Sequence, residues 1–474
     1  MPITLVVGPL LGVLILNLFG KKAMNGLAFT LACAIAIAQI ALVLAFPGFW
    51  TAGAGFLTEI FGWDAGVDSL AKVMFLAIPL VTATALMVGR QVIGGADRFF
   101  LFANLTILAM AGMNGIVLAN DLFTIYVFLE VTAVASYILI SFGRGRDALE
   151  GAFKYLLLSS VATAMLLTAI GLMISIAGGT SFALISDALK SQPNHLYAQL
   201  SLALFVAGLF IKSGLVPFHG WLPGAYSEAP SPVSVLLAGI ITKTTGVYTL
   251  VRLVITVFGP HPTTQGLLLA FGAISIVVGA IAALTQNDFK RMLAYSSISQ
   301  VGYIILGLGG GTEIAIAGAV LHLFNHAVFK TLLFVNASAV EQQTKTRDMN
   351  RLGGLSNRMP VTGTTSAIAF LSTAGIPPFS GFWSKLLIII GVWKAGFPGY
   401  AILGIAASLL TLAYFLAMQR KMFFGKLMTG FEDLKEAGAW ITIPAILLAA
   451  LTFGLGVAAP WLFETFLIPI RSIL

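Results

Sequence analysis

The segment Leu209–Leu253 reads LFIKSGLVPFHGWLPGAYSEAPSPVSVLLAGIITKTTGVYTLVRL, and the interpretation of the whole chain starts from it. Two apolar segments flank a turn rich in proline and glycine, and each carries a lysine, Lys212 or Lys243. Apolar or small residues extend about ten positions to either side of Lys243, roughly 15 Å each way at the rise of a helix. Because a lysine side chain cannot reach water over that distance, its ammonium group requires an internal partner or an internal water path. Lys243 is therefore a candidate functional residue at membrane depth.

The composition indicates a polytopic membrane protein. The chain has 474 residues, of which 58% are hydrophobic and only 9% charged, whereas soluble domains carry about 25% charged residues. The mean hydropathy is +0.98. The one cysteine, Cys33, excludes an intrachain disulfide and a cysteine-ligated cluster. The net charge of +8 is typical of basic cytoplasmic loops rather than of a partner nucleic acid.

The apolar runs predict an all-α integral membrane fold with fourteen transmembrane helices, since a span needs about 20 apolar residues. The predicted spans lie near residues 2–19, 26–46, 66–89, 98–118, 121–142, 148–177, 197–217, 231–258, 264–285, 289–309, 313–340, 361–393, 398–424 and 438–470. The first run is followed by Lys21 and Lys22, whereas a secretory signal carries its positive charge before the apolar run. We expect it to be a retained span, and we expect the last span to bend at Pro460.

Loop charges predict the orientation of the chain. Lysine and arginine residues in or beside odd-numbered loops stand at 21, 22, 90, 98, 144, 146, 290, 291, 345, 347, 351, 358, 420, 421, 426 and 435. The even-numbered loops hold little beyond Lys190 and Lys394. The positive-inside rule then places odd-numbered loops in the cytoplasm and both termini on the outer side of the inner (cytoplasmic) cell membrane.

Two motifs of the same form indicate an internal repeat, GLVPFHGW at 214–221 and GIPPFSGF at 375–382. Asn-Asp pairs at 120–121 and 287–288 open the fifth and tenth predicted spans in the same order. Spans 4–8 are therefore expected to repeat as spans 9–13, and the second copy must be inverted because five is an odd number. The predicted regions are 1–97 (spans 1–3), 98–258 (first repeat), 259–425 (second repeat) and 426–474 (span 14).

Pro217 and the pair Pro377-Pro378 interrupt the seventh and twelfth predicted spans. Proline removes a backbone donor and clashes with the carbonyl four residues before it. In a membrane the freed backbone groups must meet protein or water. Ordinary kinks are the alternative, but a charge near each interruption favours two broken helices that line hydrated cavities.

Four further charges are predicted to lie at membrane depth, namely Glu130, Lys212, Lys330 and Lys385. Insertion scales place the cost of such a charge at roughly 2.5–3.5 kcal/mol at a helix centre, so stability alone does not favour them. A lysine in an apolar setting can exchange its proton when a neighbouring charge moves, whereas arginine stays protonated. The residue types therefore suit proton movement.

His322, His326 and Lys330 stand at positions i, i+4 and i+8 of LHLFNHAVFK, which places them on one helix face. Histidine can pass a proton through its two ring nitrogens near neutral pH. Two histidines at this spacing can also ligate zinc, but the HExxH glutamate is missing and the sequence offers no third ligand, so a metal is not expected.

Other polar residues have simpler interpretations. Lys212 has a snorkelling alternative past Pro217, and snorkelling is the expectation for Lys154 at a span end. Glu228 is expected to be a loop acid and Asp68 an interfacial cap. Three histidines are interpreted as loop or cavity-mouth groups: His195, His219 and His261. The sequence contains no Walker loop, no GxGxxG after a strand and no cysteine cluster, so no cofactor and no redox centre of its own are expected.

Several motifs resemble the antiporter-like subunits of respiratory complex I, a proton-conducting membrane transporter family that includes subunits of Mrp-type Na⁺/H⁺ antiporters and membrane-bound hydrogenases. They are KSGLVPFHGWLPGAYSEAPSPVS, the lysine of GIITKTTGVY, NDFKRMLAYSSISQVGY, LHLFNHAVFK and AGIPPFSGFWSK. The match extends roughly from Asp121 to Gly425. The resemblance implies fourteen spans, with spans 4–8 and 9–13 as inverted repeats and spans 7 and 12 broken.

The resemblance also implies roles for individual residues. Glu130 matches the glutamate of span 5 and is expected to pair with Lys212, the lysine of span 7. Lys243 and Lys330 match the lysines of spans 8 and 11, and Lys385 matches the exit residue of span 12. Together they are expected to form a polar axis in the membrane plane, along which coupling passes electrostatically between adjacent subunits.

The subfamily is ambiguous. LPGAY and the lysine after the second break resemble the D-type Mrp subunit, whereas SEAPSPVS resembles complex I and hydrogenase relatives. The chain is expected to lack the lateral helix of the largest complex I subunit, because it ends after span 14.

The sequence thus predicts a proton-translocating subunit of a multisubunit complex, with neighbouring membrane subunits as partners. It leaves open whether sodium moves elsewhere in the complex and whether that complex is an oxidoreductase. One alternative is a self-contained solute transporter, and another is a structural subunit that conducts nothing.

Overall fold

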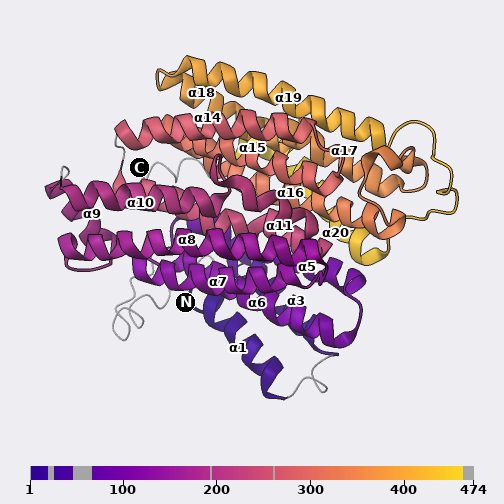
Figure 1. Cartoon of the computed structure of the whole chain (residues 1–474), viewed down its shortest axis with the longest axis horizontal. Helices are drawn as coiled ribbons and strands as arrows, with labels where there is room; N and C mark the ends of the chain where they lie inside the picture. Colours follow the sequence, from indigo (N-terminus) through magenta and orange to yellow (C-terminus); the bar gives the residue numbers. More distant parts are fainter. Residues whose placement is uncertain (1, 20–25, 46–66, 193–194, 260–261, 463–474) are drawn as a thin grey trace.

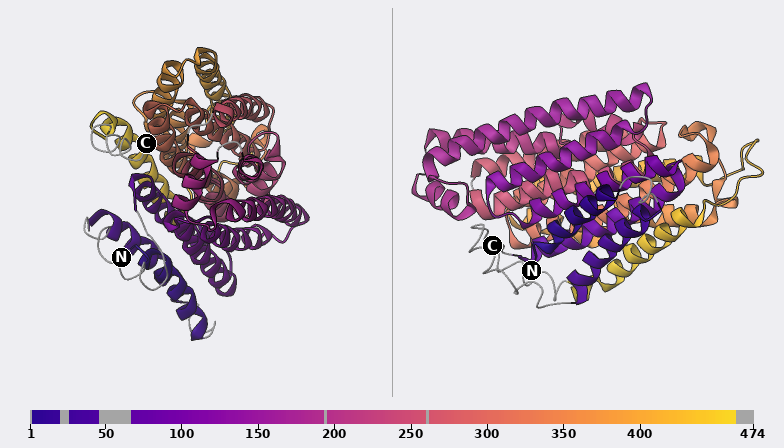
Figure 2. Two further views of the ribbon diagram at one scale, coloured as in Figure 1. Left: turned by 90° about the vertical axis from the view of Figure 1, so that its left-hand side faces the viewer. Right: turned by 90° about the horizontal axis from the view of Figure 1, so that it is seen from below.

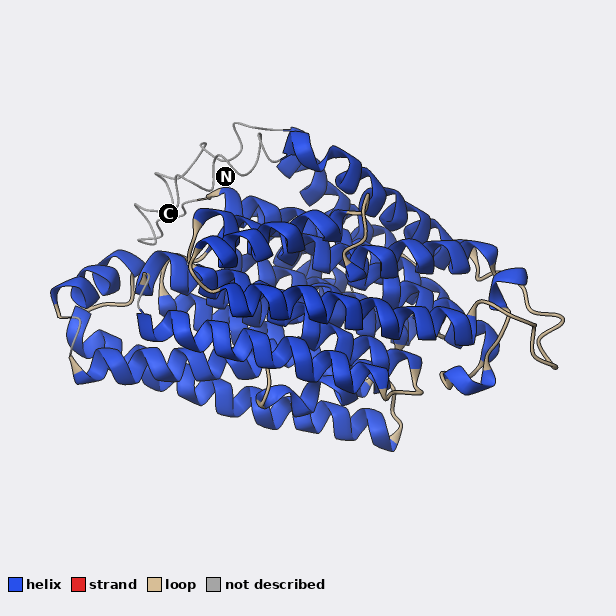
Figure 3. Cartoon of the chain, turned by 90° about the horizontal axis from the view of Figure 1, so that it is seen from above, coloured by secondary structure: helices blue, strands red, loops and turns tan. Residues whose placement is uncertain are grey.

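The computed structural model describes residues 2–19, 26–45, 67–192, 195–259 and 262–462. Within these ranges the chain is built of helices and their connections, and the only extended pairing is two isolated bridges. The long helices run side by side in one bundle (Figure 1), and colouring by secondary structure shows no strand among them (Figure 3).

The helices divide into three groups along the chain. The first group is α1 (Thr4–Leu18), α3 (Ala28–Ala45), α5 (Ser69–Val92), α6 (Ala96–Leu118), α7 (Leu122–Ser141), α8 (Arg146–Ala177), α9 (Phe182–Ser191) and α10 (Leu196–Ser213). The middle group is η2 (Phe218–Trp221), α11 (Leu222–Glu228), α12 (Ser231–Leu236), η3 (Leu237–Ile241), η4 (Lys243–Tyr248), α13 (Thr249–Leu253) and η5 (Val254–Phe258). The last group is α14 (Pro262–Leu284), α15 (Phe289–Gly310), α16 (Glu313–Thr344), η6 (Met349–Arg351), η7 (Leu355–Asn357), α17 (Pro360–Ala374), α18 (Ser380–Lys394), α19 (Pro398–Met422) and α20 (Ala439–Leu462).

The predicted all-α, multi-pass class is confirmed. Twelve helices of the described residues are long and apolar enough to cross a membrane. The count of fourteen stays a prediction, because α1 has only 15 residues and the run 361–393 is divided into α17 and α18. The amphipathic helix α9 was not predicted, and residues 463–470 of the last predicted span lie outside the described part.

Burial separates a core from two margins. Segment 231–258, which contains α12 to η5, is buried throughout its most apolar part, and α15 and α16 are nearly so. Figure 2 shows α1 and α3 at one margin and α18 and α19 at the opposite one. On α3, α8 and α19 most of the apolar surface remains outside the bundle, as expected of helices that meet lipid or another subunit.

The first helix break follows Gly214, whose φ of +67° is favourable only for glycine. The N–H of Leu215 then donates to Phe210 O, which ends α10 in the usual way for a glycine C-cap. A single 3₁₀ turn, η2, follows and places Trp221, whose indole N–H donates to Ile211 O at 2.9 Å. The break predicted at Pro217 is therefore present and internally hydrogen bonded.

The second break follows Gly375, with a φ of +82°. Its two halves are pressed together, because a Cβ on Gly381 would lie 1.9 Å from the carbonyl oxygen of Ser372. Helix α20 covers the break, since a Cβ on Gly456 would lie 2.0 Å from Pro378 O. Trp383 donates to Gly456 O at 2.8 Å, which ties α18 to α20.

Two isolated bridges have the same construction in the two halves of the chain. One joins Asp121 to Ser181 and the other joins Asp288 to Asp348, so each pairs residues 60 positions apart. In both, the first aspartate also caps the helix that follows it, accepting from the amide three residues ahead at 2.8 Å. These aspartates are the ones that the repeated Asn-Asp pairs singled out.

Candidate functional site

Glu130 and Lys212 form an ion pair between α7 and α10. The Lys212 ammonium lies 3.8 Å from Glu130 Oε1 and donates to Ser159 Oγ on α8 at 3.2 Å. Thr163, one turn further along α8, donates to the same carboxylate oxygen at 2.5 Å. Lys212 is 5% exposed, so the side chain points into the bundle and the snorkelling alternative is wrong.

Glu130 differs from the deeply buried acid that its mid-span position suggested. Its side chain is 38% exposed in the isolated chain. Helix α7 lies next to α8 at the edge of the bundle (Figure 1). A carboxylate at membrane depth does not face lipid without great cost. This exposed fraction therefore marks a surface that another protein or internal water covers in the membrane.

Lys243 begins the π-helical segment η4, which closely follows the π-helical segment η3. Its side chain is completely buried, and the ammonium group donates to the carbonyl of Ala238. Extended π-helical runs are rare, and π-turns occur frequently at functional sites. Lys243 thus lies in the interior of the bundle, and its depth in the membrane stays a prediction.

Two glycines set how closely η3 and η4 approach their neighbours. A Cβ on Gly246 would lie 2.5 Å from the backbone nitrogen of Ser213, the residue after Lys212. A Cβ on Gly239 would lie 2.4 Å from Thr331 Oγ1, the residue after Lys330. The segment carrying Lys243 is thus packed directly against α10 on one side and α16 on the other.

Lys330 lies on α16 and is completely buried. Its ammonium group donates to Leu293 O at 3.1 Å and to the hydroxyl of Ser296, both on α15. It also lies 5.9 Å from the ring centroid of Phe415 on α19, a favourable position for a cation.

His322 and His326 are both completely buried on the same face of α16, with ring centroids 6.1 Å apart. His322 Nδ1 is 2.8 Å from Ser384 Oγ on α18, whereas its Nε2 has no hydrogen-bond partner among the described residues. Neither ring nitrogen of His326 has one there either. Buried imidazole nitrogens of this kind are usually satisfied by internal water.

Lys385 lies on α18, one helical turn after the second break, and is 3% exposed. Its ammonium group donates to Thr373 O on α17 at 2.8 Å, so it connects the two halves of the broken helix. The same ammonium group lies 4.4 Å from the ring centroid of Tyr303 on α15, a close cation–π contact.

The structure therefore groups the predicted residues into two clusters. In the first cluster Lys330 shares α16 with the two histidines, and His322 contacts Ser384, the residue before Lys385. The segment η3, whose Ala238 carbonyl accepts from Lys243, packs against α16 beside Lys330. The Glu130–Lys212 pair is a separate cluster built from α7, α8 and α10.

A charge network that the sequence did not predict joins the two halves of the chain. Arg347 lies 3.0 Å from Glu228 at the end of α11, 3.2 Å from Asp288 at the start of α15 and 4.0 Å from Glu341 on α16. Burial raises the pKa of the Asp288 carboxyl above its usual 3.8, although the charge of Arg347 opposes the shift. The interpretation of Glu228 as a simple loop acid is therefore wrong.

Lys290 belongs to the same region and lies in the first turn of α15, beside the predicted loop, but its side chain is buried. It is 1% exposed, donates to Ala229 O at 2.8 Å, and lies 3.4 Å from Glu341. Its neighbour Ser231 also donates to Glu341. The ammonium group thus connects the residues before α12 to α16.

Asp68 is the cap that the sequence predicted, since its carboxylate accepts from the amide of Ala71 at 2.9 Å. It also forms a two-pronged ion pair with Arg252, a buried arginine on α13 that was overlooked in the sequence. Burial acts to raise the pKa of Asp68, but the hydrogen bond and charge of Arg252 outweigh it and hold that pKa below 3.8.

The remaining polar residues lie away from both clusters. Lys154 pairs at 2.6 Å with Glu150 on the exposed face of α8, so it stays at the surface. His195 caps α10 through the amide of Tyr197, and His219 lies in η2 at the first break. His261 lies outside the described residues.

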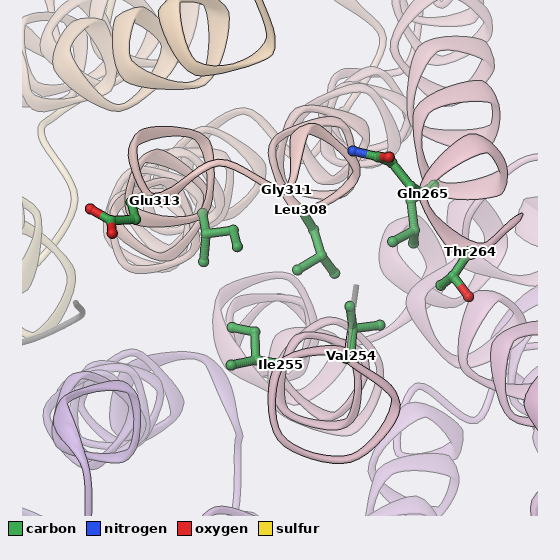
Figure 4. Close-up of a pocket in the computed structure, with 10 residues that line it drawn as sticks. Val254, Ile255, Thr264, Gln265, Leu308, Gly311 and Glu313 are labelled. Carbon is green, nitrogen blue, oxygen red and sulfur yellow. The ribbon is translucent and has the colours of Figure 1, made fainter. Parts of the chain in front are cut away.

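A cavity of about 190 Å³ lies where η5, α14, α15 and the start of α16 meet. Val254 and Ile255 face Leu308 across it (Figure 4). Thr264, Gln265 and Glu313 are the residues with polar side chains among those that line it, and the lysines and histidines of the two clusters do not line it.

Known proteins resemble this chain in sequence and in fold. Residues 119–411 match the family described as NADH:quinone oxidoreductase/Mrp antiporter, TM. NADH-quinone oxidoreductase subunit N of Desulforudis audaxviator is 39% identical over 316 residues, which cover 66% of this chain and 63% of that protein. The D subunit of the Na(+)/H(+) antiporter of Alkalihalophilus pseudofirmus is 32% identical over 405 residues, or 85% of this chain and 82% of that protein.

The fold resembles that of a chain in the Mrp complex from Dietzia sp. DQ12-45-1b. The TM-score is 0.89 at 23% identity, and the match covers 100% of this chain and 97% of that one. Taken with the sequence matches, this places the chain plainly in the NADH:quinone oxidoreductase/Mrp antiporter family, as a multi-pass, antiporter-like membrane subunit.

Proposed function

We propose that this subunit moves protons across the membrane through its buried lysines. The observation that carries the proposal is the bonding of Lys243, Lys330 and Lys385. In the described part of the chain each donates only to carbonyl or hydroxyl oxygens, and none forms an ion pair. A buried lysine without a carboxylate partner gains and loses its proton easily when a nearby charge changes.

The Glu130–Lys212 pair supplies such a changing charge. When a neighbouring charge draws Glu130 away from Lys212, the positive charge of Lys212 is less compensated and its field on the next lysine increases. Lys243 then releases its proton toward Lys330, through internal water and the His322 and His326 face. Lys385 exchanges the proton at the far end of the route.

The neighbour is expected to be another membrane protein of the same complex. The half-exposed Glu130 on α7 supports this, because a partner there would desolvate the carboxylate and feel its charge. The parent assembly is related to complex I, to membrane-bound hydrogenases or to Mrp antiporters. The relatives named above belong to an NADH-quinone oxidoreductase and to a Na(+)/H(+) antiporter. Sodium movement would belong to other members of the assembly.

The fold is proposed to contain fourteen spans in two inverted five-span repeats. The two bridges with 60-residue spacing and their capping aspartates support the repeat, as do the breaks after Gly214 and Gly375. The regions are then 98–258 and 259–425, flanked by 1–97 and 426–474, with both termini on the outer side of the membrane.

The proposal is tested by replacing Lys243 in the complete complex, reconstituted into sealed vesicles. Lys243→Ala should abolish proton translocation with the complex still assembled, and Lys243→Arg should abolish it as well, because arginine does not release its proton. Lys154→Ala is the matched control, since Lys154 is an exposed surface lysine.

Translocation that persists in Lys243→Ala would contradict the proposal and favour a structural subunit that conducts nothing. Uptake of a solute by the purified chain without partners would favour a self-contained transporter.

A further inference from the structure

Helix α15 carries a polar stripe that the proposed route does not yet use. Ser296, Gln300 and Tyr303 stand at positions i, i+4 and i+7, so they lie on one face of the helix. Along the axis Ser296 and Tyr303 are separated by about 10 Å at the helical rise. All three side chains are completely buried.

The two ends of this stripe hold two of the buried lysines. Lys330 donates to the hydroxyl of Ser296, and the ammonium group of Lys385 lies 4.4 Å from the Tyr303 ring. Lys330 reaches the stripe from α16 and Lys385 reaches it from α18. The stripe therefore connects the two lysines that exchange a proton last in the proposed route.

Gln300, in the middle of the stripe, is the polar group without a partner. Neither its amide nitrogen nor its amide oxygen forms a hydrogen bond in the described part of the chain, and the side chain is 0% exposed. The hydroxyl of Tyr414 on α19 interacts electrostatically with Thr411, Ser296 and Gln300, and it likewise has no hydrogen-bond partner in the described part of the chain. Leaving buried donors and acceptors unpaired is costly, so native proteins satisfy such groups with internal water.

We propose that Gln300 and Tyr414 bind internal water that relays the proton between Lys330 and Lys385. In one step the ammonium group of Lys330 gives a proton to the bound water, and the water gives a different proton to the neutral amine of Lys385. One proton moves, Lys330 becomes neutral, Lys385 becomes charged, and the water is regenerated. The inference rests on the proposed function and assigns its last internal transfer to α15.

The stripe suits this step better than the histidine face does. His322 Nδ1 is engaged with Ser384. His326 precedes Lys330 by one turn of α16 and both of its ring nitrogens lack a partner in the described part of the chain, which suits it to the earlier transfer from Lys243 to Lys330. The amide of Gln300 accepts and donates a hydrogen bond without titrating, so it can orient water in either direction of transfer.

The experiment compares Gln300→Leu with Lys243→Ala in the complete complex reconstituted into sealed vesicles. Proton translocation per assembled complex is measured in H₂O and in D₂O. Gln300→Leu keeps the side-chain volume, so assembly should be normal, while translocation should fall at least about tenfold. Tyr414→Phe removes only a hydroxyl without a hydrogen bond and should also slow translocation, with an increased solvent isotope effect. Gln300→Ser, which leaves room for water and supplies a hydroxyl in place of the amide, should keep more of the rate than Gln300→Leu.

Gln419→Leu is the control for loss of a buried amide, because Gln419 on α19 is hydrogen bonded to Gly363 and Ser366. It should lower thermal stability and leave translocation per assembled complex unchanged.

If Lys243→Ala abolishes translocation while Gln300→Leu and Tyr414→Phe keep the full rate, the relay is overturned and the proposed function stands. If Lys243→Ala translocates normally, the proposed function itself fails. If Gln300→Leu does not assemble, Tyr414→Phe decides alone.

Discussion

The ammonium group of Lys212 lies 3.8 Å from the carboxylate of Glu130, and the two residues reach each other from α10 and α7. Because Lys212 is buried and Glu130 is half exposed, the acid is the partner that responds to charges outside the subunit. We predict that Glu130→Gln uncouples the subunit from its neighbour. Translocation by the reconstituted complex should fall by about 5- to 150-fold, which is the factor that corresponds to a typical coupling free energy between two sites.

Glu150→Gln is the matched control for this prediction, since Glu150 pairs with Lys154 on the exposed face of α8. It should leave translocation unchanged, because a solvated pair contributes little. A normal rate in Glu130→Gln, measured by dye quenching in vesicles, would show that the ion pair has no part in coupling.

The close contact at the second break gives a prediction about assembly. A Cβ on Gly381 would lie 1.9 Å from the carbonyl oxygen of Ser372. Because this oxygen is a backbone atom within a helix, it cannot move aside as a flexible side chain could. Gly381→Ala should therefore push α17 and α18 apart and lower stability by at least about 1–3 kcal/mol. The yield and thermal midpoint of the solubilised complex measure this change.

Gly399→Ala provides the comparison, because a Cβ at Gly399 in α19 meets nothing within 4 Å. Gly399 is the second residue of α19, where the preference for alanine over glycine is small, so this variant should be about as stable as the original. Equal behaviour of the two variants would mean that the break tolerates separation of its halves.

The sequence predicts well those features that depend on local chemistry. Burial of Lys243 follows from the apolar residues on both sides of it, and the break after Gly214 follows from Pro217, which cannot continue a helix. Asp68 was expected to cap the helix that follows it, and it does. Asp288 was singled out by the repeated Asn-Asp pairs, and it caps α15. None of these inferences needs information about the partner helix.

Features that depend on distant packing were not predicted. Lys290 stands beside a predicted loop, where a lysine is usually exposed. Its side chain is nevertheless buried and contacts Ala229 before α12 and Glu341 on α16. Arg252 was overlooked because its partner Asp68 is 184 residues away in the sequence. The polar stripe around Gln300 could have been found, since Ser296, Gln300 and Tyr303 are spaced at i, i+4 and i+7 in a predicted span.

The network around Arg347 gives a third prediction. This guanidinium is shared by Glu228, Asp288 and Glu341, which come from α11, α15 and α16. Arg347→Ala would leave three partly buried carboxylates facing one another. We expect a loss of about 1–3 kcal/mol, because hydrogen bonds to charged groups are involved.

Arg347→Lys should restore only part of that stability, because an ammonium group cannot bond three carboxylates in a fixed fork geometry. Thermal unfolding of the solubilised complex at low and high salt is the measurement. Full stability in the alanine variant would show that the carboxylates do not depend on this arginine.

The Asp68–Arg252 pair gives a prediction about pH. The pKa of Asp68 is held below its usual 3.8 by Arg252, against the opposing effect of burial. An acid whose folded pKa is depressed contributes stability above the unfolded pKa and loses that contribution as pH falls through the folded value. Asp68→Asn retains a good helix cap but leaves the buried Arg252 without a counter-charge, at a cost of about 3–5 kcal/mol near neutral pH.

The difference in thermal midpoint between the original chain and Asp68→Asn should therefore be greatest near neutral pH. It should begin to shrink below about pH 4, where Asp68 of the unfolded chain takes up a proton. It should disappear only as the pH falls through the lower pKa of Asp68 in the folded chain, where the protonated side chain resembles the variant. Asp187→Asn on α9 is a suitable control, since this aspartate lies in a short helix outside the predicted spans. A difference that stays constant from pH 7 to pH 3 would contradict the role of the Asp68 charge. The buried Arg252 would then be stabilised mainly by its hydrogen bonds to Tyr248.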